Sequence, residues 1–112
     1  MSFQHACSTA DIGPAEALSV TLSTADATDV AVAIVRDSDG TWHAIGDRCT
    51  HGDVLLSEGE VEDGSIECWG HSARFDLTTG TPTLPATQPT PVYPLSIDED
   101  RVLVDVDHPT QA

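Results

Sequence analysis

The chain has 112 residues, the size of one compact domain, which excludes a multidomain enzyme. Its 19 acidic residues stand against four basic ones, all of them arginine, and the formal net charge is -15 at pH 7. A field of this sign repels nucleic acid and anionic membranes, and it would steer the protein towards a basic patch on a partner protein.

No stretch of the sequence looks like a secretion signal or a membrane span. The N-terminal segment lacks a basic start, an apolar run of signal length and a cleavage pattern. Nowhere are there about 18 consecutive apolar residues. We therefore expect a cytoplasmic protein without a membrane partner. In that reducing compartment a pair of cysteines binds metal or does chemistry more often than it forms a disulfide.

Apolar and polar residues alternate with period two along the chain, which predicts β-strands. Segment 17–23 places Leu18, Val20 and Leu22 on one face, and segment 29–36 alternates in the same way. Further strands are expected at 41–45, 65–69, 92–97 and 101–106. Turn residues separate these runs, at Gly40, at Asp63-Gly64 and at 98–100. The pattern predicts an all-β fold, an antiparallel sandwich or small barrel.

Two stretches do not fit a strand. One is 48–57, and the other is 81–91, which contains four prolines and therefore cannot be a central strand. The chain has no internal repeat, charge block or interdomain linker, so residues 1–112 are expected to form a single domain.

Four residues with metal-binding side chains stand in these loops and beside them. Cys49-x-His51 is followed by sixteen residues and then by Cys68-x-x-His71. Each arm offers one thiolate and one imidazole from a tight loop. The Asp63-Gly64 turn between the arms would fold the chain back and bring the two loops side by side.

Three kinds of site use such residues. Two cysteines and two histidines suit tetrahedral zinc, although zinc fingers usually pair like ligands whereas each arm here is mixed. A cysteine nucleophile with a histidine base needs one such pair and leaves the other unexplained. A [2Fe-2S] cluster in which two histidines replace two cysteines on one iron uses all four residues. We favour the iron-sulfur interpretation and keep zinc as an alternative.

The segment from Cys49 to Gly80 resembles the Rieske-type [2Fe-2S] ferredoxin family, in its Cys-x-His and Cys-x-x-His arms and in the RFDLTTG that follows. The resemblance extends over residues 29–106. It implies a Rieske-like antiparallel fold, with a cluster-binding subdomain at about 46–78 inserted in a β base domain, and one [2Fe-2S] cluster. By the same resemblance Cys49 and Cys68 ligate the buried iron, His51 and His71 ligate the exposed iron, and Pro85 lies in a shielding loop.

The positions beside the ligands indicate a low reduction potential. High-potential members of the family have a disulfide between the two loops, where this chain has Val54 and Gly70, and hydroxyl donors after the second histidine, where it has Ala73 and Phe75. Hydrogen bonds to sulfur stabilise the added electron, so their loss lowers the potential. We expect roughly -150 mV, the low end of the range for Rieske centres.

The resemblance implies an electron carrier, not an enzyme. It would be a monomer that takes one electron from a flavin-dependent ferredoxin reductase and passes it to the terminal oxygenase of an aromatic-ring dioxygenase system or to another redox acceptor. Acidic residues such as Asp53, Glu58 and Asp76 are candidates for steering the encounter. The alternatives are a carrier for iron-sulfur assembly, a zinc-stabilised interaction module, and a regulatory protein like the small subunit of nitrite reductase.

Four other residues receive no functional role. Cys7 is expected to be a small buried strand residue. His5 and His108 are expected at the surface, and His43 is expected to pack in a strand with a hydrogen bond to its ring.

Overall fold

The computed structural model describes residues 3–48, 54–62, 64–68, 73–84 and 88–109. Within these ranges the regular structure consists of β-strands and two single-turn 3-10 helices, and every strand pair is antiparallel. The strands are β1 (Gln4–Ser8), β2 (Glu16–Ser23), β3 (Asp29–Arg36), β4 (Trp42–Gly46), β5 (Val61–Glu62), β6 (Ser65–Glu67), β7 (Arg74–Asp76), β8 (Val92–Tyr93), β9 (Leu95–Asp98) and β10 (Arg101–Val104), and the 3-10 helices are η1 (Thr9–Asp11) and η2 (Leu56–Glu58). The predicted all-β antiparallel fold is confirmed.

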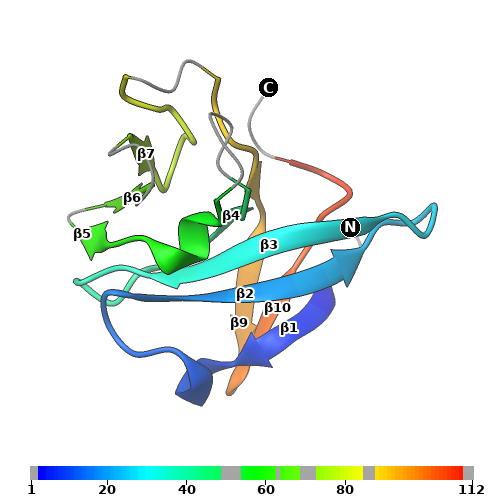
Figure 1. Ribbon diagram of the computed structural model, residues 1–112. Coiled ribbons are helices and arrows are strands. Elements are labelled where there is room, and N and C mark those ends of the chain that lie inside the picture. Colours follow the sequence, from blue (N-terminus) through cyan, green and yellow to red (C-terminus); the bar gives the residue numbers. More distant parts are fainter. Residues whose placement is uncertain (1–2, 49–53, 63, 69–72, 85–87, 110–112) are drawn as a thin grey trace.

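The strands form three sheets. The orders are β1-β10-β9, β2-β3-β4-β8 and β5-β6-β7. The small third sheet is formed by chain that lies between β4 and β8 in sequence. In Figure 1 this sheet lies above the long β2–β3 ribbon, while β1 lies below it. The subdomain boundary at about 46–78 stays a prediction, although the third sheet falls inside it.

Strand β3 separates two apolar cores. Val32 and Ile34 face one core, and Ala33 and Val35, one position out of phase, face the other; all four are fully buried. We call the first the base core: Cys7, Ile12, Leu22, Val32, Ile34, Ala44, Tyr93, Val102, Val104 and Val106. We call the second the loop core: Ala33, Val35, Ile45, Leu56, Val61, Ile66, Cys68, Ala73, Phe75, Leu77 and Val92. Successive side chains of a strand point to opposite faces, so one strand contributes to both.

The predicted strands at 17–23 and 29–36 are confirmed as β2 and β3. The predicted run 92–97 is divided into two strands, because Pro94 has no N–H to continue a ladder and the chain passes there from one sheet to another. The predicted strand at 65–69 ends at Glu67. β7 was not predicted, since three residues are too few for alternation to be recognised.

The predicted turns also lie where the sequence placed them. Gly40 and Gly64 have positive φ values of 91° and 81°, and Glu99 in the 98–100 turn has a φ of 59°. Gly80 has a φ of 77°, and a Cβ there would stand 2.1 Å from the Thr90 carbonyl oxygen. Only glycine combines this backbone conformation with so close an approach.

Within the described residues there is no helix with the length and apolar character needed to cross a membrane.

Candidate metal centre

The base of the first loop is closed by Asp47, whose side chain is fully buried. Its Oδ1 accepts a hydrogen bond from the Ser57 N–H (2.8 Å), and its Oδ2 accepts one from the Ser57 hydroxyl (3.1 Å). Its carbonyl oxygen accepts a third from the Leu56 N–H (2.5 Å). Arg48 and Leu55 form a β-bridge next to these bonds. The two ends of the segment that carries Cys49 and His51 are therefore fixed beside each other.

The base of the second loop is closed at the end of β6. The Cys68 N–H donates to the Ala73 carbonyl oxygen at 2.6 Å, so the segment that carries His71 begins and ends at adjacent residues. The Cys68 side chain is fully buried in the loop core with Leu56, Ile66 and Phe75. A cysteine sulfur at this place is shielded from water by apolar side chains.

The two loop bases are packed directly on each other. Gly59, which ends η2, comes so close to β6 that a Cβ would stand 1.6 Å from the Glu67 carbonyl oxygen. The Glu67 N–H donates to the Glu60 carbonyl oxygen at 2.8 Å. The fully buried Leu56 packs in the loop core with Cys68. These contacts fix the distance between the base of the first loop and Cys68.

The proline-rich segment is attached to both loops. The buried Thr90 hydroxyl donates to the Gly46 carbonyl oxygen (3.1 Å), and the Gly46 N–H donates to the Pro91 carbonyl oxygen (2.9 Å). At its other end Thr83 exchanges two hydrogen bonds with the backbone of Arg74 (2.8 and 2.9 Å). Three segments far apart in sequence thus have their ends at one side of the fold.

The four predicted ligands are not all within the described residues. The structure describes Cys68, whereas Cys49, His51 and His71 lie outside the described residues, as do Pro85, Gly70 and Asp53. In the part of the chain that is described, no three or more His, Cys, Asp or Glu side chains are grouped to hold a metal ion. The assignment of all four ligands therefore stays a prediction.

The surroundings of Cys68 fit a buried thiolate ligand of an iron-sulfur cluster. Its neighbours Ala73 and Phe75 are both fully buried and carry no side-chain hydrogen-bond donor, and Val54 is packed at the margin of the loop core. Thiolates are the ligands that such clusters prefer, and an apolar shell limits solvent access.

The charged residues near the loops are mainly acidic. Arg74 lies 3.8 Å from carboxylate oxygens of both Glu62 and Glu67, and its Nε donates to the Ser65 hydroxyl at 2.9 Å. Glu58 and Asp76 are exposed, as steering residues would have to be. The Asp76 carboxylate also accepts hydrogen bonds from two backbone N–H groups of the following turn, which fixes its orientation.

The residues that received no role lie as expected. The half-buried His43 has its Nε2 3.1 Å from the Thr41 hydroxyl, and burial lowers the pKa of its imidazole. Cys7 is buried in β1, where burial raises the pKa of its thiol. His5 is exposed. His108 is exposed too, and its Nδ1 lies 2.9 Å from the fully buried carboxylate of Asp105.

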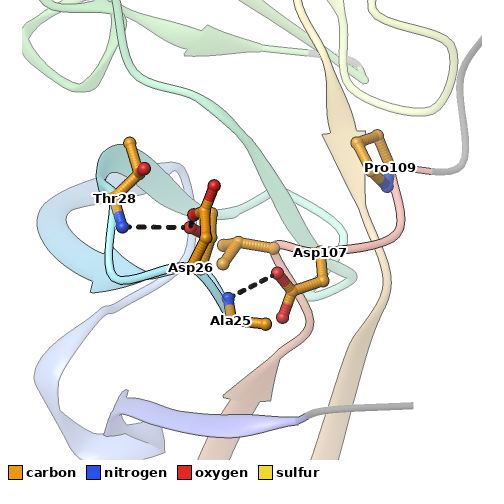
Figure 2. Close-up of a pocket in the computed structure, with 7 residues that line it drawn as sticks. Ala25, Asp26, Thr28, Asp107 and Pro109 are labelled. Atoms are coloured by element: carbon orange, nitrogen blue, oxygen red, sulfur yellow. Dashed lines mark hydrogen bonds between the residues drawn. The ribbon is translucent and has the colours of Figure 1, made fainter.

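A recess of about 600 Å³ lies between the β2–β3 turn and the C-terminal segment. Figure 2 shows Asp107 pointing to the turn, where its Oδ1 accepts a hydrogen bond from the Ala25 N–H at 2.8 Å. Asp26 faces the same recess and is held by bonds with threonines of its own turn. Cys68, the one predicted ligand within the described residues, does not line this recess.

Three residues that shape the site were missed at the level of sequence: Asp47, Ser57 and Thr90. A usable signal existed for the first, because Asp47 is an acidic residue next to an apolar strand and two positions before Cys49. Ser57 and Thr90 lie in segments where hydroxyl residues are common, and only the fold shows which hydroxyl is buried.

The fold and the loop bases define a small all-β protein in which two loops, each carrying a cysteine and a histidine, close at one end of an antiparallel framework. The family model of the Rieske [2Fe-2S] domain matches residues 2–94. The chain therefore belongs to the Rieske [2Fe-2S] family, whose cofactor is one [2Fe-2S] cluster.

The relatives include the biphenyl dioxygenase ferredoxin subunit of Pseudomonas sp. (strain KKS102), which is 42% identical over 107 residues, covering 94% of this chain and 93% of the relative. Among solved structures, the ferredoxin of Sphingomonas yanoikuyae B1 aligns with a TM-score of 0.82 at 28% identity, covering 93% of this chain and 98% of the other. A ferredoxin in complex with the oxygenase of carbazole 1,9a-dioxygenase aligns with a TM-score of 0.79 at 30% identity, covering 94% of each chain.

Proposed function

We propose that this protein is a low-potential Rieske ferredoxin that carries single electrons to the terminal oxygenase of a ring-hydroxylating dioxygenase system. The observation that carries the proposal is the end-to-end similarity to a biphenyl dioxygenase ferredoxin subunit, over 94% of this chain and 93% of that one. Nearly the whole chain is thus accounted for by a subunit named as a ferredoxin. The chain itself is then an electron-transfer protein, and the oxygenase is the enzyme.

In this proposal Cys49 and Cys68 bind one iron, and His51 and His71 bind the other. The bound cluster supplies a site that accepts and releases one electron. Ala73 and Phe75 surround Cys68 with apolar groups and offer its sulfur no hydroxyl donor, which supports the low potential. The bonds at the loop bases hold the base of the first loop and the base of the second loop in a fixed relation.

The partners in this proposal are a flavin-dependent ferredoxin reductase as electron donor and the oxygenase as acceptor. The carbazole dioxygenase ferredoxin, similar in fold over 94% of this chain, is seen in a complex with its oxygenase, which supports an oxygenase partner. The acidic surface, with Glu58 and Asp76 exposed, would favour a basic patch on either partner. The monomeric state and the cytoplasmic location stay predictions.

Iron and sulfide analysis of the purified protein tests the proposal. We expect about two irons and two acid-labile sulfides per chain, a red-brown colour, and a reduction potential of roughly -150 mV. Zinc in place of iron would identify the interaction module instead, and a potential well above 0 mV would contradict the low-potential assignment.

Electron transfer tests the partner. A reduced sample should pass electrons to a ring-hydroxylating oxygenase, and the rate should fall as the ionic strength rises to physiological values, because salt screens the attraction between exposed charges. A rate that does not change with salt would refute electrostatic steering. Transfer to iron-sulfur assembly proteins but not to an oxygenase would favour the assembly role.

A further inference from the structure

Asp47 differs from the other charged residues around the loops, because its carboxylate is completely removed from water. Burying a carboxylate is costly unless its oxygens are hydrogen-bonded. Both of its oxygens receive such bonds, and both come from a single residue, Ser57, through its backbone N–H and its hydroxyl. The carboxylate therefore acts as a two-point attachment between β4 and η2.

The backbone of Asp47 is fixed independently of its side chain. Its N–H donates to the Ala31 carbonyl oxygen in β3 at 3.1 Å, and its own carbonyl oxygen accepts from the Leu56 N–H. Asp47 is thus anchored on the central strand, and its carboxylate reaches from that anchor to Ser57. Both side-chain oxygens bond to Ser57, so the contribution of the carboxylate falls on the base of the loop.

The contact between Asp47 and Ser57 lies at the base of the loop that carries Cys49 and His51. Asp47 lies two residues before Cys49, and Ser57 lies six residues after His51. The Arg48–Leu55 bridge and the Leu56–Asp47 backbone bond lie between the contact and the loop. Separation of Asp47 from Ser57 would let η2 move off β3 and open the base of the loop that carries half of the proposed ligands.

We propose that Asp47 is a positioning residue: through its two bonds to Ser57 it keeps the Cys49–His51 loop closed at its base and so sets how slowly the protein loses its [2Fe-2S] cluster. The inference rests on the proposed ligand set. It gives Asp47, which is not one of the proposed ligands, control over how long the cluster is retained.

The test compares Asp47→Ala and Asp47→Asn with a matched control, Asp105→Ala. Asp105 is also a fully buried aspartate, but it lies after β10, and its carboxylate bonds to the Asp107 N–H and to His108, both in the C-terminal segment. The measured quantities are the rate of iron release to a chelator from the loaded protein, its visible circular dichroism, and hydrogen exchange of the Ser57 and Leu56 amides in the cluster-free protein.

In Asp47→Ala, iron release should accelerate about tenfold, which corresponds to about 1.4 kcal/mol for unsatisfied donors at a buried site. The Ser57 and Leu56 amides should exchange faster, and the dichroism of the cluster should change. Asp47→Asn should restore slow release, because an amide oxygen accepts from the Ser57 N–H and an amide NH2 donates to the Ser57 oxygen. Asp105→Ala should lower the unfolding temperature without faster iron release from folded protein.

Ser57→Ala covers the case in which Asp47→Ala fails to fold. It removes one of the two bonds and keeps the backbone N–H, so release should accelerate by a smaller factor, about threefold. If Ser57→Ala or Asp47→Ala releases iron no faster than Asp105→Ala, the inference is wrong, and the proposed function stands. A wild-type protein that takes up no iron and sulfide would overturn the ligand set, and with it both proposals.

Discussion

The two sides of β3 are built in different ways. On the side of the base core, β2 pairs with β3 over eight residues in unbroken register, and β10 pairs with β9 over its full length. On the side of the loop core, strands β5, β6 and β7 have only two or three residues. There the chain is held by individual hydrogen bonds at loop ends, such as the two between Asp47 and Ser57 and the one between Cys68 and Ala73.

This difference has a physical meaning. Long ladders distribute stability over many backbone bonds, so one substitution removes a small share of them. Short strands and individual side-chain bonds concentrate the stability in a few contacts, so a local change can open one segment while the rest stays folded. Substitutions on the base-core side of β3 should therefore disturb the structure less than substitutions on the loop-core side. Pairs of matched substitutions, one on each side, can measure this difference.

The largest effect is expected from Cys68, which is compared with Cys7, a buried cysteine on the other side of β3. Cys68→Ala removes a proposed ligand and should abolish the visible absorption of the cluster, with loss of order at the loop base because cluster binding contributes folding energy. Cys7→Ala is the matched control in the base core and should keep the spectrum. A Cys68→Ala protein with an unchanged visible spectrum would refute the ligand assignment.

Two fully buried aliphatic residues give the next comparison. Leu56→Ala in the loop core and Ile34→Ala in the base core should each lower the free energy of unfolding by about 2–5 kcal/mol. Leu56→Ala should also accelerate iron loss below its unfolding temperature, because Leu56 packs in the same core as Cys68. Urea unfolding and iron release are measured on both. Equal rates of iron release from Leu56→Ala and Ile34→Ala would contradict the expected difference between the two sides of β3.

A smaller effect is expected at the junction with the proline-rich segment. Thr90→Val keeps the side-chain volume and removes the hydrogen bond to the Gly46 carbonyl oxygen, at a cost of about 1 kcal/mol. Amide exchange near Gly80, which accepts from the Thr90 N–H, reports whether the segment loosens. Thr83→Val, at the other attachment of that segment, is the comparison variant.

The smallest effect concerns pH. Burial lowers the pKa of His43 below its usual value of 6.5, although Asp37, Asp39 and Asp76 oppose the shift. The unfolded chain therefore takes up a proton more readily than the folded chain, so this residue makes stability fall as the pH drops through about 6.5 and below. His43→Gln should reduce that fall, as measured by unfolding at several pH values. A steeper fall in the variant would reverse the assigned sign.

The sequence predicted the strands of the base core better than the contacts on the loop-core side of β3. Leu18, Val20 and Leu22 alternate with polar residues, and one buried face imposes that pattern directly on the sequence. Asp47 and Ser57 are ten residues apart and meet because η2 packs on β3, which no local pattern encodes. Pro94 could have been recognised as a corner, since proline cannot continue a ladder.

For the site, the ligand residues could be proposed because their order and spacing are unusual, and the buried position of Cys68 agrees with that proposal. The neighbouring hydroxyl and carboxylate groups could not, because many residues of those types occur along the chain. Their roles depend on burial, which follows from tertiary packing.

The hydrogen bond from the Gly46 N–H to the Pro91 carbonyl oxygen means that the entire loop side leaves the framework and returns to it at one point. Such a segment could in principle be cut out and replaced by a short hairpin turn. The truncated chain would, however, present Ala33, Val35, Ile45 and Val92 to water as a bare apolar sheet face, and it should aggregate. The segment as a whole therefore has to be retained as the cover of that face.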